Sequence, residues 1–467
     1  MSPSNQQRIE RDSLGERKIP SDVYYGIQTA RAVENFPISG WRPYSALVTA
    51  TVQIKKAAAR VNAALGVLDP KIAEAIERAA CEVLAGQLRD QFVVDPFQAG
   101  AGTSHNMNVN EVLANRAIEL LGGKKGDYSV VHPNDHVNMG QSTNDVFPTA
   151  MRLSALELAG ELIPALDALS NAFQVKADEF KNVVKSGRTH LQDAVPMTVG
   201  QEFGGYAAAI SSNAARIRAA TDELMEIGLG GTAVGTGLNA APGYRKLVVQ
   251  ELSRLTGLPL KPATNYFEAM QSLSPFVGLS GALKTAATDL IRIANDLRLL
   301  ASGPNTGLAE IKLPAVQPGS SIMPGKVNPV MAEMTDMVCF QVIGNDLTIT
   351  MAAQAGQLEL NVMMPVVAFD LLMSLTILTS AVKVLRARCV EGITLDEERG
   401  RWYAEHSASL VTALNPRIGY ARAAEIAKRA IARGKTIREV IAEDKLLSDE
   451  ELDQVMDLRS MTEEEGR

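Results

Sequence analysis

The chain has 467 residues and a net charge of −7, with acidic and basic residues interspersed along its length. This length allows roughly three domains of about 150 residues each around ample apolar cores, which excludes a small binding module. The charge balance excludes a basic surface that would attract nucleic acid, so we expect small molecules or copies of the same chain as partners.

The amino-terminal segment and the cysteines predict a cytoplasmic protein. Residues 1–12 are polar and of mixed charge, without the apolar stretch of a signal peptide. Cys81, Cys339 and Cys389 lie far apart and outside any metal-ligand spacing, which predicts buried thiols in a reducing compartment.

The amino-terminal third mixes loops with helical segments. Residues 13–43 are rich in loop residues, 46–88 and 104–121 have helical periodicity, and 122–140 resembles a linker. We therefore expect a helical amino-terminal region that a long connection joins to the next part of the chain.

Long apolar helices dominate the centre. Apolar side chains recur every three or four residues at Leu158, Leu162, Leu166, Leu169, Phe173, Ala177 and Phe180, and again at Leu279, Leu283, Ala286, Leu290, Ala294 and Leu297. A third set covers 330–387, where Gly344, Gly356 and Pro365 should bend or break the helix, whereas Pro164 should at most kink the first. Aromatic content is only 5%, so long helices packed side by side through Leu, Ala and Met are the favoured architecture.

One central segment is apolar enough to raise a membrane alternative. Residues 362–382 contain Asp370 and a few hydroxyls but are otherwise apolar, and their length could span a bilayer. Charges recur in the flanking helical segments and no second span exists, which favours a buried helix of a bundle and no membrane partner. After Gly392 the chain becomes polar, with shorter helical segments that suggest a small carboxy-terminal domain.

Three segments concentrate small polar residues where helices could begin: 100–110, 140–148 and 187–196. Hydroxyls and amides at such positions ordinarily cap unpaired N–H groups. The same groups at a helix amino terminus also suit a carboxylate ligand, and these segments could converge if long helices align them.

The segment 319–329, Gly-Ser-Ser-Ile-Met-Pro-Gly-Lys-Val-Asn-Pro, is the most informative in the chain. Gly319 and Gly325 allow the main chain to approach a ligand, and the prolines at 324 and 329 oppose helix formation. Two hydroxyls, a cation and an amide in one irregular loop suit a small dianionic substrate. A purely structural loop is the alternative, because glycine and proline mark turns everywhere.

The sequence predicts no cofactor and no metal. Five residues separate Gly319 from Gly325 and Val327 follows Lys326, so the loop does not match a phosphate-binding P-loop. The glycine-rich stretch 228–237 matches a dinucleotide fingerprint formally, but it follows a helical pattern and opens no β-α-β unit, so we reject that interpretation. A tight connection between helices that brings backbone N–H groups to a site is the alternative left open. His132 and His136 form an HxxxH pair outside a clear helix, which is a weak metal signal.

Taken together, these segments resemble the aspartase/fumarase superfamily, specifically its class II fumarase and aspartate ammonia-lyase branch. The resemblance runs from 8–12 to 414–420, and its most specific motif is Gly-Ser-Ser…Met-Pro…Lys…Asn-Pro in the 319–329 loop. It implies an all-α fold of three domains, which we place at 1–141, 142–397 and 398–467. It also implies a homotetramer whose bundles form one helical core and whose active sites each take residues from three subunits.

The resemblance further implies the site and its chemistry: elimination from C2 of a succinate-type substrate to give fumarate, through a dianionic aci-carboxylate. The base is matched by Ser320, the carboxylate at the reacting carbon by binding positions Thr103, Ser142, Thr143 and Ser321, and the other carboxylate by binding positions Thr189, Lys326 and Asn328. Two further residues match positions near the leaving group, Asn144 and His190. Glu333 matches the acid that pairs with this histidine. Taken alone, a histidine such as His190, with Arg188 and Asp193 nearby, is more often structural than catalytic.

The leaving group separates two activities within the branch. Thr103-Ser104-His105, Ser142-Thr143-Asn144 and Pro329-Val330-Met331 favour the aspartases, which release ammonia from L-aspartate. Class II fumarase activity, the release of water from L-malate, is the alternative, and a non-catalytic structural role such as that of lens crystallins is a third. Asn305 and Met364 depart from residues that relatives commonly carry.

Overall fold

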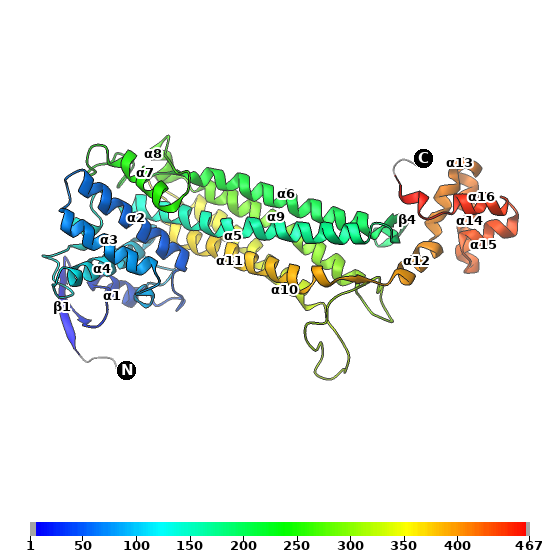
Figure 1. Cartoon of the computed structure of the whole chain (residues 1–467), viewed down its shortest axis with the longest axis horizontal. Helices are drawn as coiled ribbons and strands as arrows, with labels where there is room; N and C mark the ends of the chain where they lie inside the picture. The colour runs from blue at the N-terminus through cyan, green and yellow to red at the C-terminus, as the bar shows by residue number, and fades with distance from the viewer. Residues whose placement is uncertain (1–5, 464–467) are drawn as a thin grey trace. The chain divides into compact units, whose positions relative to one another are not determined.

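The structure is a computed structural model that describes residues 6–463, and it is mainly helical (Figure 1). The helices are α1 (Ile27–Asn35), α2 (Ser45–Ala64), α3 (Pro70–Leu84), α4 (Thr103–Leu120), α5 (Thr143–Glu179), α6 (Val199–Asp222), α7 (Tyr244–Thr256), α8 (Tyr266–Gln271), α9 (Ser274–Leu300), α10 (Val330–Gln354), α11 (Met364–Arg388), α12 (Glu397–His406), α13 (Asn415–Ile418), α14 (Tyr420–Arg433), α15 (Ile437–Asp444) and α16 (Asp449–Val455). The strands are β1 (Gln7–Asp12), β2 (Gly15–Pro20), β3 (Val184–Thr189), β4 (Gln192–Thr198), β5 (Glu226–Ile227), β6 (Lys261–Pro262), β7 (Ile311–Lys312) and β8 (Thr394–Leu395), and they pair two by two.

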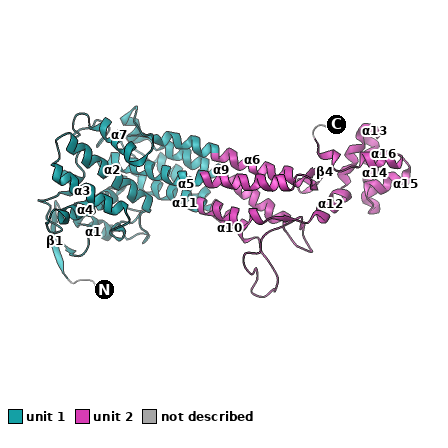
Figure 2. Ribbon diagram, in the orientation of Figure 1, with its two compact units in different colours: residues 1–163, 215–285, 340–378 teal, residues 164–214, 286–339, 379–467 magenta. Residues whose placement is uncertain are grey.

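The chain divides into two compact units (Figure 2). Unit 1 comprises Met1–Ile163, Ala215–Thr285 and Phe340–Leu378, and unit 2 comprises Pro164–Ala214, Ala286–Cys339 and Thr379–Arg467. The long helices α5, α6, α9, α10 and α11 contribute residues to both units. The division into three consecutive domains remains a prediction.

Unit 1 is built on α2, α3 and α4. Their apolar faces form one buried cluster that includes Val52, Ile76 and Val112, each completely inaccessible to solvent. Helix α3 begins sharply because Pro70 occupies its first turn and the Asp69 carboxylate accepts the N–H of Lys71 at 2.8 Å. Burial of a helical stripe, rather than intrinsic propensity, therefore fixes these three helices.

The amino-terminal segment is more regular than its sequence indicates. Strands β1 and β2 form an antiparallel hairpin and α1 follows, where we expected mainly loop at 13–43. The strands carry many charged residues, which are poor strand formers, so their sequence gives little signal. Ion pairs compensate for this poor strand propensity. The Arg31 guanidinium binds the Asp12 carboxylate at 2.8 Å and holds the pKa of Asp12 below its usual value.

Polar contacts join the long helices within unit 1. The Asp346 carboxylate of α10 accepts hydrogen bonds from Ser280 Oγ at 2.8 Å and Lys284 Nζ at 2.6 Å, both on α9. The Asn345 amide donates to Ser374 Oγ on α11 at 3.0 Å. These bonds fix the rotation of α10, whose sequence is apolar on most sides.

Unit 2 contains the other portions of the same helices and shows the predicted packing. Phe173 of α5 packs against Phe203 and Tyr206 of α6, and Tyr206 donates its hydroxyl proton to Asp296 of α9 at 3.1 Å. Pro164 lies inside the uninterrupted α5, because neighbouring packing tolerates one lost backbone bond.

The 330–387 segment is two helices. Gly344 lies inside α10, whereas Gly356 lies in the break and Pro365 in the first turn of α11, where its missing N–H is harmless. Among the described residues, one helix, Met364–Gly392, is long and apolar enough to cross a membrane, and 72% of its most apolar window is buried. That burial is expected of a core helix.

The carboxy-terminal helices of unit 2 form a separate apolar cluster. Ile426, Val440 and Leu452 lie in it, and capping boxes begin α15 at Thr436 and α16 at Ser448. The predicted short helices after Gly392 are thus confirmed. One cysteine expectation is wrong: Cys339 and Cys389 are buried but Cys81 is exposed on α3.

Candidate active site

Helix α4 begins inside the first polar segment, as predicted. Gly102 has φ +85°, and a Cβ there would lie 2.2 Å from the Phe147 ring of α5, so only glycine allows these two helix starts to approach so closely. Thr103, the first residue of α4, is exposed, and within residues 6–463 its hydroxyl makes only a 3.5 Å contact with the carbonyl oxygen of Gly100. Its hydroxyl is therefore available to a ligand.

The second polar segment forms the start of α5 and brings three predicted residues together. Ser142 Oγ accepts the N–H of Asn144 at 3.2 Å, which caps the helix. Thr143 Oγ1 accepts a hydrogen bond from the Asn106 amide of α4 at 3.1 Å. The Asn144 amide donates to the Ala233 carbonyl at 2.8 Å, so the glycine-rich connection orients this side chain.

Asp145 anchors this helix start. Its carboxylate accepts the N–H groups of Ser142, Gly230 and Thr232, each at 2.9 Å. Burial raises the pKa of Asp145 to about 6, and the three backbone N–H groups oppose that shift.

The stretch 228–237 lies between β5 and α7, not between two helices, and the N–H groups of Gly230 and Thr232 in it donate to Asp145. A two-residue strand, β5, does precede it and pairs in parallel with β6 beyond α7, so the expectation of no strand and no β-α-β unit was wrong. Strands of two residues leave almost no periodicity in a sequence. The dinucleotide interpretation still fails, since Asp145 already takes the N–H groups of Gly230 and Thr232.

Sequence reasoning missed a buried lysine beside this cluster. Lys55 of α2 is completely inaccessible to solvent and donates to Asn138 Oδ1 at 2.8 Å and Gln141 Oε1 at 3.0 Å. Burial lowers its pKa to about 7, against the attraction of Asp145. A signal was available: Lys55 lies in phase with the apolar residues of α2, whereas its neighbour Lys56 does not.

The third polar segment is a β-hairpin and begins no helix, so that expectation was wrong. Strands β3 and β4 pair Thr189 with Gln192, which leaves His190 and Leu191 as a two-residue turn. Both have positive φ, 56° and 59°, a conformation that the sequence conceals because Asn-Gly is the usual signal for such a turn. The hairpin holds Thr189 and His190 exposed at its tip.

Arg188 supports this hairpin from within unit 2. Its guanidinium forms two hydrogen bonds to Glu310, at 2.8 and 3.1 Å, and lies 5.2 Å from the ring centroid of Tyr403. Lys185 on the same strand binds the Glu202 carboxylate at 2.7 Å. Arg188 is thus occupied by structural partners and is not an available cation beside His190.

The 319–329 loop is irregular, as predicted, and bonded to itself. The N–H groups of Ile322 and Met323 donate to Ser320 Oγ at 3.2 and 2.9 Å. The Gly319 N–H donates to the Lys326 carbonyl oxygen at 2.9 Å, and a Cβ at Gly319 would lie 2.3 Å from that oxygen. The loop lines a cavity of about 480 Å³ from Ala315 to Val327.

The remaining predicted residues lie in or just after this loop. Ser321 and Lys326 are exposed, and within residues 6–463 Lys326 has no ion-pair partner. The Asn328 amide donates to the Gly319 carbonyl oxygen at 2.7 Å and closes the loop. Glu333 lies in the first turn of α10, and no hydrogen bond joins it to His190 within the described chain.

The histidine pair has a structural role. His132 Nδ1 accepts the N–H groups of Asn134 and Asp135, each at 3.2 Å, and His136 Nδ1 accepts the His132 N–H at 2.8 Å. The Nδ1 atoms of both histidines thus accept hydrogen bonds from backbone N–H groups. Within residues 6–463 there is no group of three or more His, Cys, Asp or Glu side chains suited to a metal.

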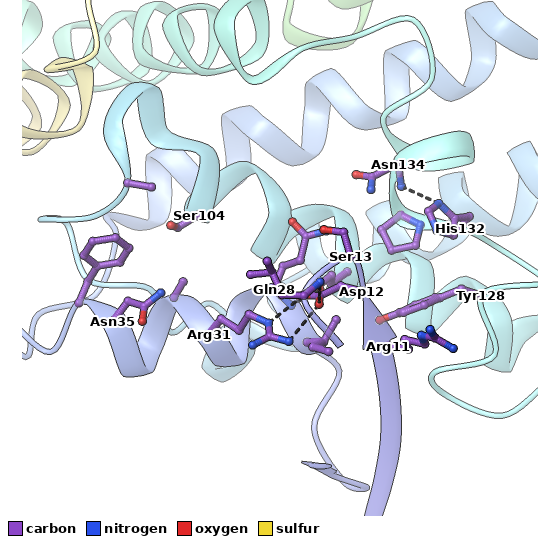
Figure 3. Close-up of a pocket in the computed structure, with 17 residues that line it drawn as sticks. Arg11, Asp12, Ser13, Gln28, Arg31, Asn35, Ser104, Tyr128, His132 and Asn134 are labelled. Atoms are coloured by element: carbon purple, nitrogen blue, oxygen red, sulfur yellow. Dashed lines mark hydrogen bonds and ion pairs between the residues drawn. The ribbon is translucent and has the colours of Figure 1, made fainter. Parts of the chain in front are cut away.

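A cavity of about 520 Å³ in unit 1 is lined in part by His132 (Figure 3). Arg31 and Asp12 line it as an ion pair, and His132 and Asn134 are joined by the hydrogen bond described above. None of the predicted site residues lines this cavity, so it is separate from the start of α5.

The predicted site residues thus fall into two sets. Thr103, Ser142, Thr143 and Asn144 belong to unit 1; Thr189, His190, Ser320, Ser321, Lys326, Asn328 and Glu333 belong to unit 2. Each set presents hydroxyl and amide groups, and the second adds an ammonium and an imidazole. Such donors suit carboxylates and a developing oxyanion.

Comparison with known proteins agrees with this chemistry. Residues 15–344 match the family described as Lyase, and residues 410–463 match the family described as Fumarase C C-terminus. An aspartate ammonia-lyase of Bacillus subtilis is 50% identical over 99% of this chain and 97% of its own, and a class II fumarate hydratase of Thermosynechococcus vestitus is 49% identical over 98% of both. A crystal structure titled as a fumarate lyase:delta crystallin from Brucella melitensis bound to cobalt matches with a TM-score of 0.95, 52% identity, and coverage of 98% of this chain and 100% of that one. The chain belongs to the lyase family that includes aspartate ammonia-lyases and class II fumarate hydratases.

Proposed function

We propose that this protein is a cytoplasmic carbon–nitrogen lyase that converts L-aspartate reversibly to fumarate and ammonia. The observation that carries the reaction type is the loop geometry, in which two backbone N–H groups donate to Ser320 Oγ. The leaving group is supported by relatives named aspartate ammonia-lyase, which are about 50% identical over nearly the whole chain.

Ser320 is the proposed base. A serine hydroxyl is a weak base in water, so an alkoxide needs stabilisation by its surroundings. The N–H groups of Ile322 and Met323 supply two donors at 3.2 and 2.9 Å, and Lys326 follows in the same loop. The base removes the C3 proton, and charge develops on the adjacent carboxylate as the aci-carboxylate forms.

Two sets of donors bind the two ends of the substrate. Thr103, Ser142, Thr143 and Ser321 bind the carboxylate that becomes the aci-carboxylate, where preorganised donors contribute most to catalysis. Thr189, Lys326 and Asn328 bind the other carboxylate, with Lys326 as its cation. No cofactor or metal enters this scheme.

Asn144 and His190 lie near the leaving ammonia, and Glu333 pairs with His190 to orient the ring. The strained turn holds His190 at the hairpin tip, which supports a positioned role for this side chain. His190 and Glu333 share no hydrogen bond within the described chain, and in the proposed assembly each would pair with its counterpart on another copy of the chain.

The proposed active enzyme is a homotetramer with sites shared among three subunits, and its chains have the three-domain division given above. Met337, Phe340, Leu347 and Met351 form an apolar stripe along α10 and are each 56–63% exposed. Their spacing places them on one helix face, the usual form of a helix-packing interface. The exposure of this stripe supports the proposed assembly, in which other copies would bury it.

Fumarate hydratase activity is the second candidate, favoured by the relative of that name at 49% identity. Both reactions share the elimination and differ in the group that leaves C2. Met364, one of the two departures noted above, is buried at the start of α11 and is not one of the predicted site residues.

The test offers the purified protein L-aspartate and L-malate separately and follows fumarate by its ultraviolet absorbance. We expect turnover of L-aspartate well above that of L-malate, and a loss of several orders of magnitude in Ser320→Ala. Faster turnover of L-malate would assign the protein to the hydratases. Activity on neither substrate would favour a different amine or a structural role.

A further inference from the structure

A buried ammonium lies behind the proposed carboxylate-binding residues of unit 1. Lys55 contacts neutral amide oxygens of Asn138 and Gln141, and no hydrogen bond joins it to a carboxylate within the described chain. A buried charge without a paired opposite charge is unfavourable for folding. Stability alone does not explain a lysine at this position, whereas its hydrogen bonds constrain the neighbouring side chains.

Lys55 sets the orientation of the Asn138 amide. In its ammonium form Lys55 only donates hydrogen bonds, and the oxygen of Asn138, not its nitrogen, accepts from Lys55 Nζ at 2.8 Å. The same oxygen accepts from the Asn106 and Asn110 amide nitrogens, both at 3.2 Å. The ammonium and the Gln141 carbonyl oxygen, which accepts from Asn138 Nδ2 at 3.2 Å, together orient the Asn138 amide, and its oxygen then orients the other two amides.

The last hydrogen bond of this series reaches the hydroxyl of Thr143. The Asn106 Nδ2 group has two hydrogens, and it donates one to Asn138 and one to Thr143 Oγ1 at 3.1 Å. A hydroxyl that accepts from Asn106 keeps its own proton for another acceptor. Thr143 is therefore held as a donor, the role that binding of a carboxylate requires.

The opposite orientation would remove this donor. Without Lys55, the Asn138 and Asn106 amides could rotate together and present the Asn106 oxygen to Thr143, whose proton would then bind Asn106. The present orientation leaves Asn106 Oδ1 and Asn110 Oδ1 buried without a hydrogen-bond partner in the described chain. An unsatisfied buried polar atom costs about 1–3 kcal/mol, and rotation would only put an amide nitrogen in place of each oxygen, so the hydrogen bonds of Asn138 to Lys55 and Gln141 decide the orientation.

We propose that Lys55 is a positioning residue that acts through Asn138 and Asn106 to hold the Thr143 hydroxyl as a hydrogen-bond donor toward the substrate carboxylate. This inference rests on the proposed role of Thr143. It assigns a function to a residue that does not touch the substrate. The same lysine also binds Gln141, the residue that precedes Ser142, and so holds the turn from which α5 begins.

The test is a double-mutant cycle on kcat/KM, with the substrate, L-aspartate or L-malate, that the wild-type protein turns over. Lys55→Met removes the ammonium at similar volume, and Thr143→Val removes the hydroxyl. We expect Lys55→Met to lower kcat/KM by about 10-fold or more in the wild-type background but by less than about 3-fold in the Thr143→Val background. Lys55→Arg, which keeps the donors, should recover part of the loss.

Lys56→Met is the matched control, because Lys56 contacts Cys81 and Glu77 on the other side of α2; its kcat/KM should stay within about 2-fold of wild type. If Lys55→Met does not fold, Asn106→Asp takes its place in the cycle, because it removes the N–H that donates to Thr143 Oγ1. Equal losses in both backgrounds, or an undiminished kcat/KM, would overturn the inference and leave the proposed activity intact. An unaffected Thr143→Val would overturn the role of Thr143 as well, and absence of turnover would overturn both.

Discussion

The buried histidine of α4 illustrates how single residues of unit 1 are constrained. The Thr51 hydroxyl donates its proton to the Leu47 carbonyl at 2.8 Å, so the 3.0 Å contact between Thr51 and His105 must use an Nε2–H of the histidine. Burial, followed by the charge of Lys55, lowers the pKa of His105 to about 4. His105 is thus a neutral structural donor and not an acid–base group.

His105 should make stability depend on pH. Its pKa is about 4 when folded and near 6.5 when unfolded, so the unfolded chain binds the extra proton between these values and stability is lost as pH falls through that window. His105→Gln keeps a donor and does not titrate, so its free energy of unfolding should fall less between about pH 7 and about pH 5 than that of wild type. Urea denaturation at both pH values measures the difference, and parallel changes in the two proteins would show that His105 is already protonated in the folded state.

For single residues, the sequence predicts where polar side chains cap helices better than it predicts which side chains contact one another. Thr103 and Ser142 to Asn144 lie at helix starts, as their composition indicates. The links between Lys55, Asn138 and Asn106 were not predicted, because they join residues far apart in sequence through orientations that only packing fixes. Arg188 shows the same limit, since its partner Glu310 gives no sign in the sequence of being nearby.

Among the elements, the β3–β4 hairpin is the least predictable from sequence and the most strained. A left-handed conformation costs a non-glycine residue roughly 1–2 kcal/mol, and this turn has two such residues. Leu191 is 70% exposed, so no apolar packing compensates for its conformation. The strain is consistent with a turn selected to present His190.

Leu191→Gly should stabilise the protein. Glycine adopts positive φ without steric cost, and after allowance for the entropy of the unfolded chain we expect a gain of about 1 kcal/mol. Leu191→Ala is the matched control, since it also loses the exposed side chain but keeps the Cβ. Thermal denaturation should show a higher midpoint for the glycine variant than for the alanine variant, and an equal or lower midpoint would mean that the turn is not strained at this residue.

The helices are the elements that the sequence predicts well. Their apolar periodicity is long and regular, and the structure confirms α5, α9 and the pair α10 and α11. The hairpins are missed because two short strands with charged or mixed residues give little periodicity, and because a turn of His and Leu lacks the usual residues.

For the whole molecule, the central prediction concerns shared active sites. If Ser320 and Thr143 act in one site but come from different subunits, Ser320→Ala and Thr143→Val proteins should complement each other after gentle dissociation and reassociation. Mixed tetramers would contain some sites with both wild-type residues and recover a small fraction of the turnover. Fumarate formation before and after mixing measures this recovery.

The control for this experiment pairs two changes in one loop. Ser320→Ala and Lys326→Ala lie in the same segment of one chain, so no mixture of these two proteins creates an intact loop, and no activity should return. If the first pair also fails although subunit exchange is demonstrated, Ser320 and Thr143 act from the same chain.

The bonds within the 319–329 loop affect the entropy of catalysis. Gly319 pairs with Lys326, Asn328 binds Gly319, and the N–H groups of Ile322 and Met323 bind Ser320. The proposed base and the cation therefore belong to one internally bonded ring and keep their mutual arrangement in any orientation that the ring adopts. Ordering of this segment over a substrate then restricts rotation mainly at its two ends, and most of its backbone entropy is already lost during folding.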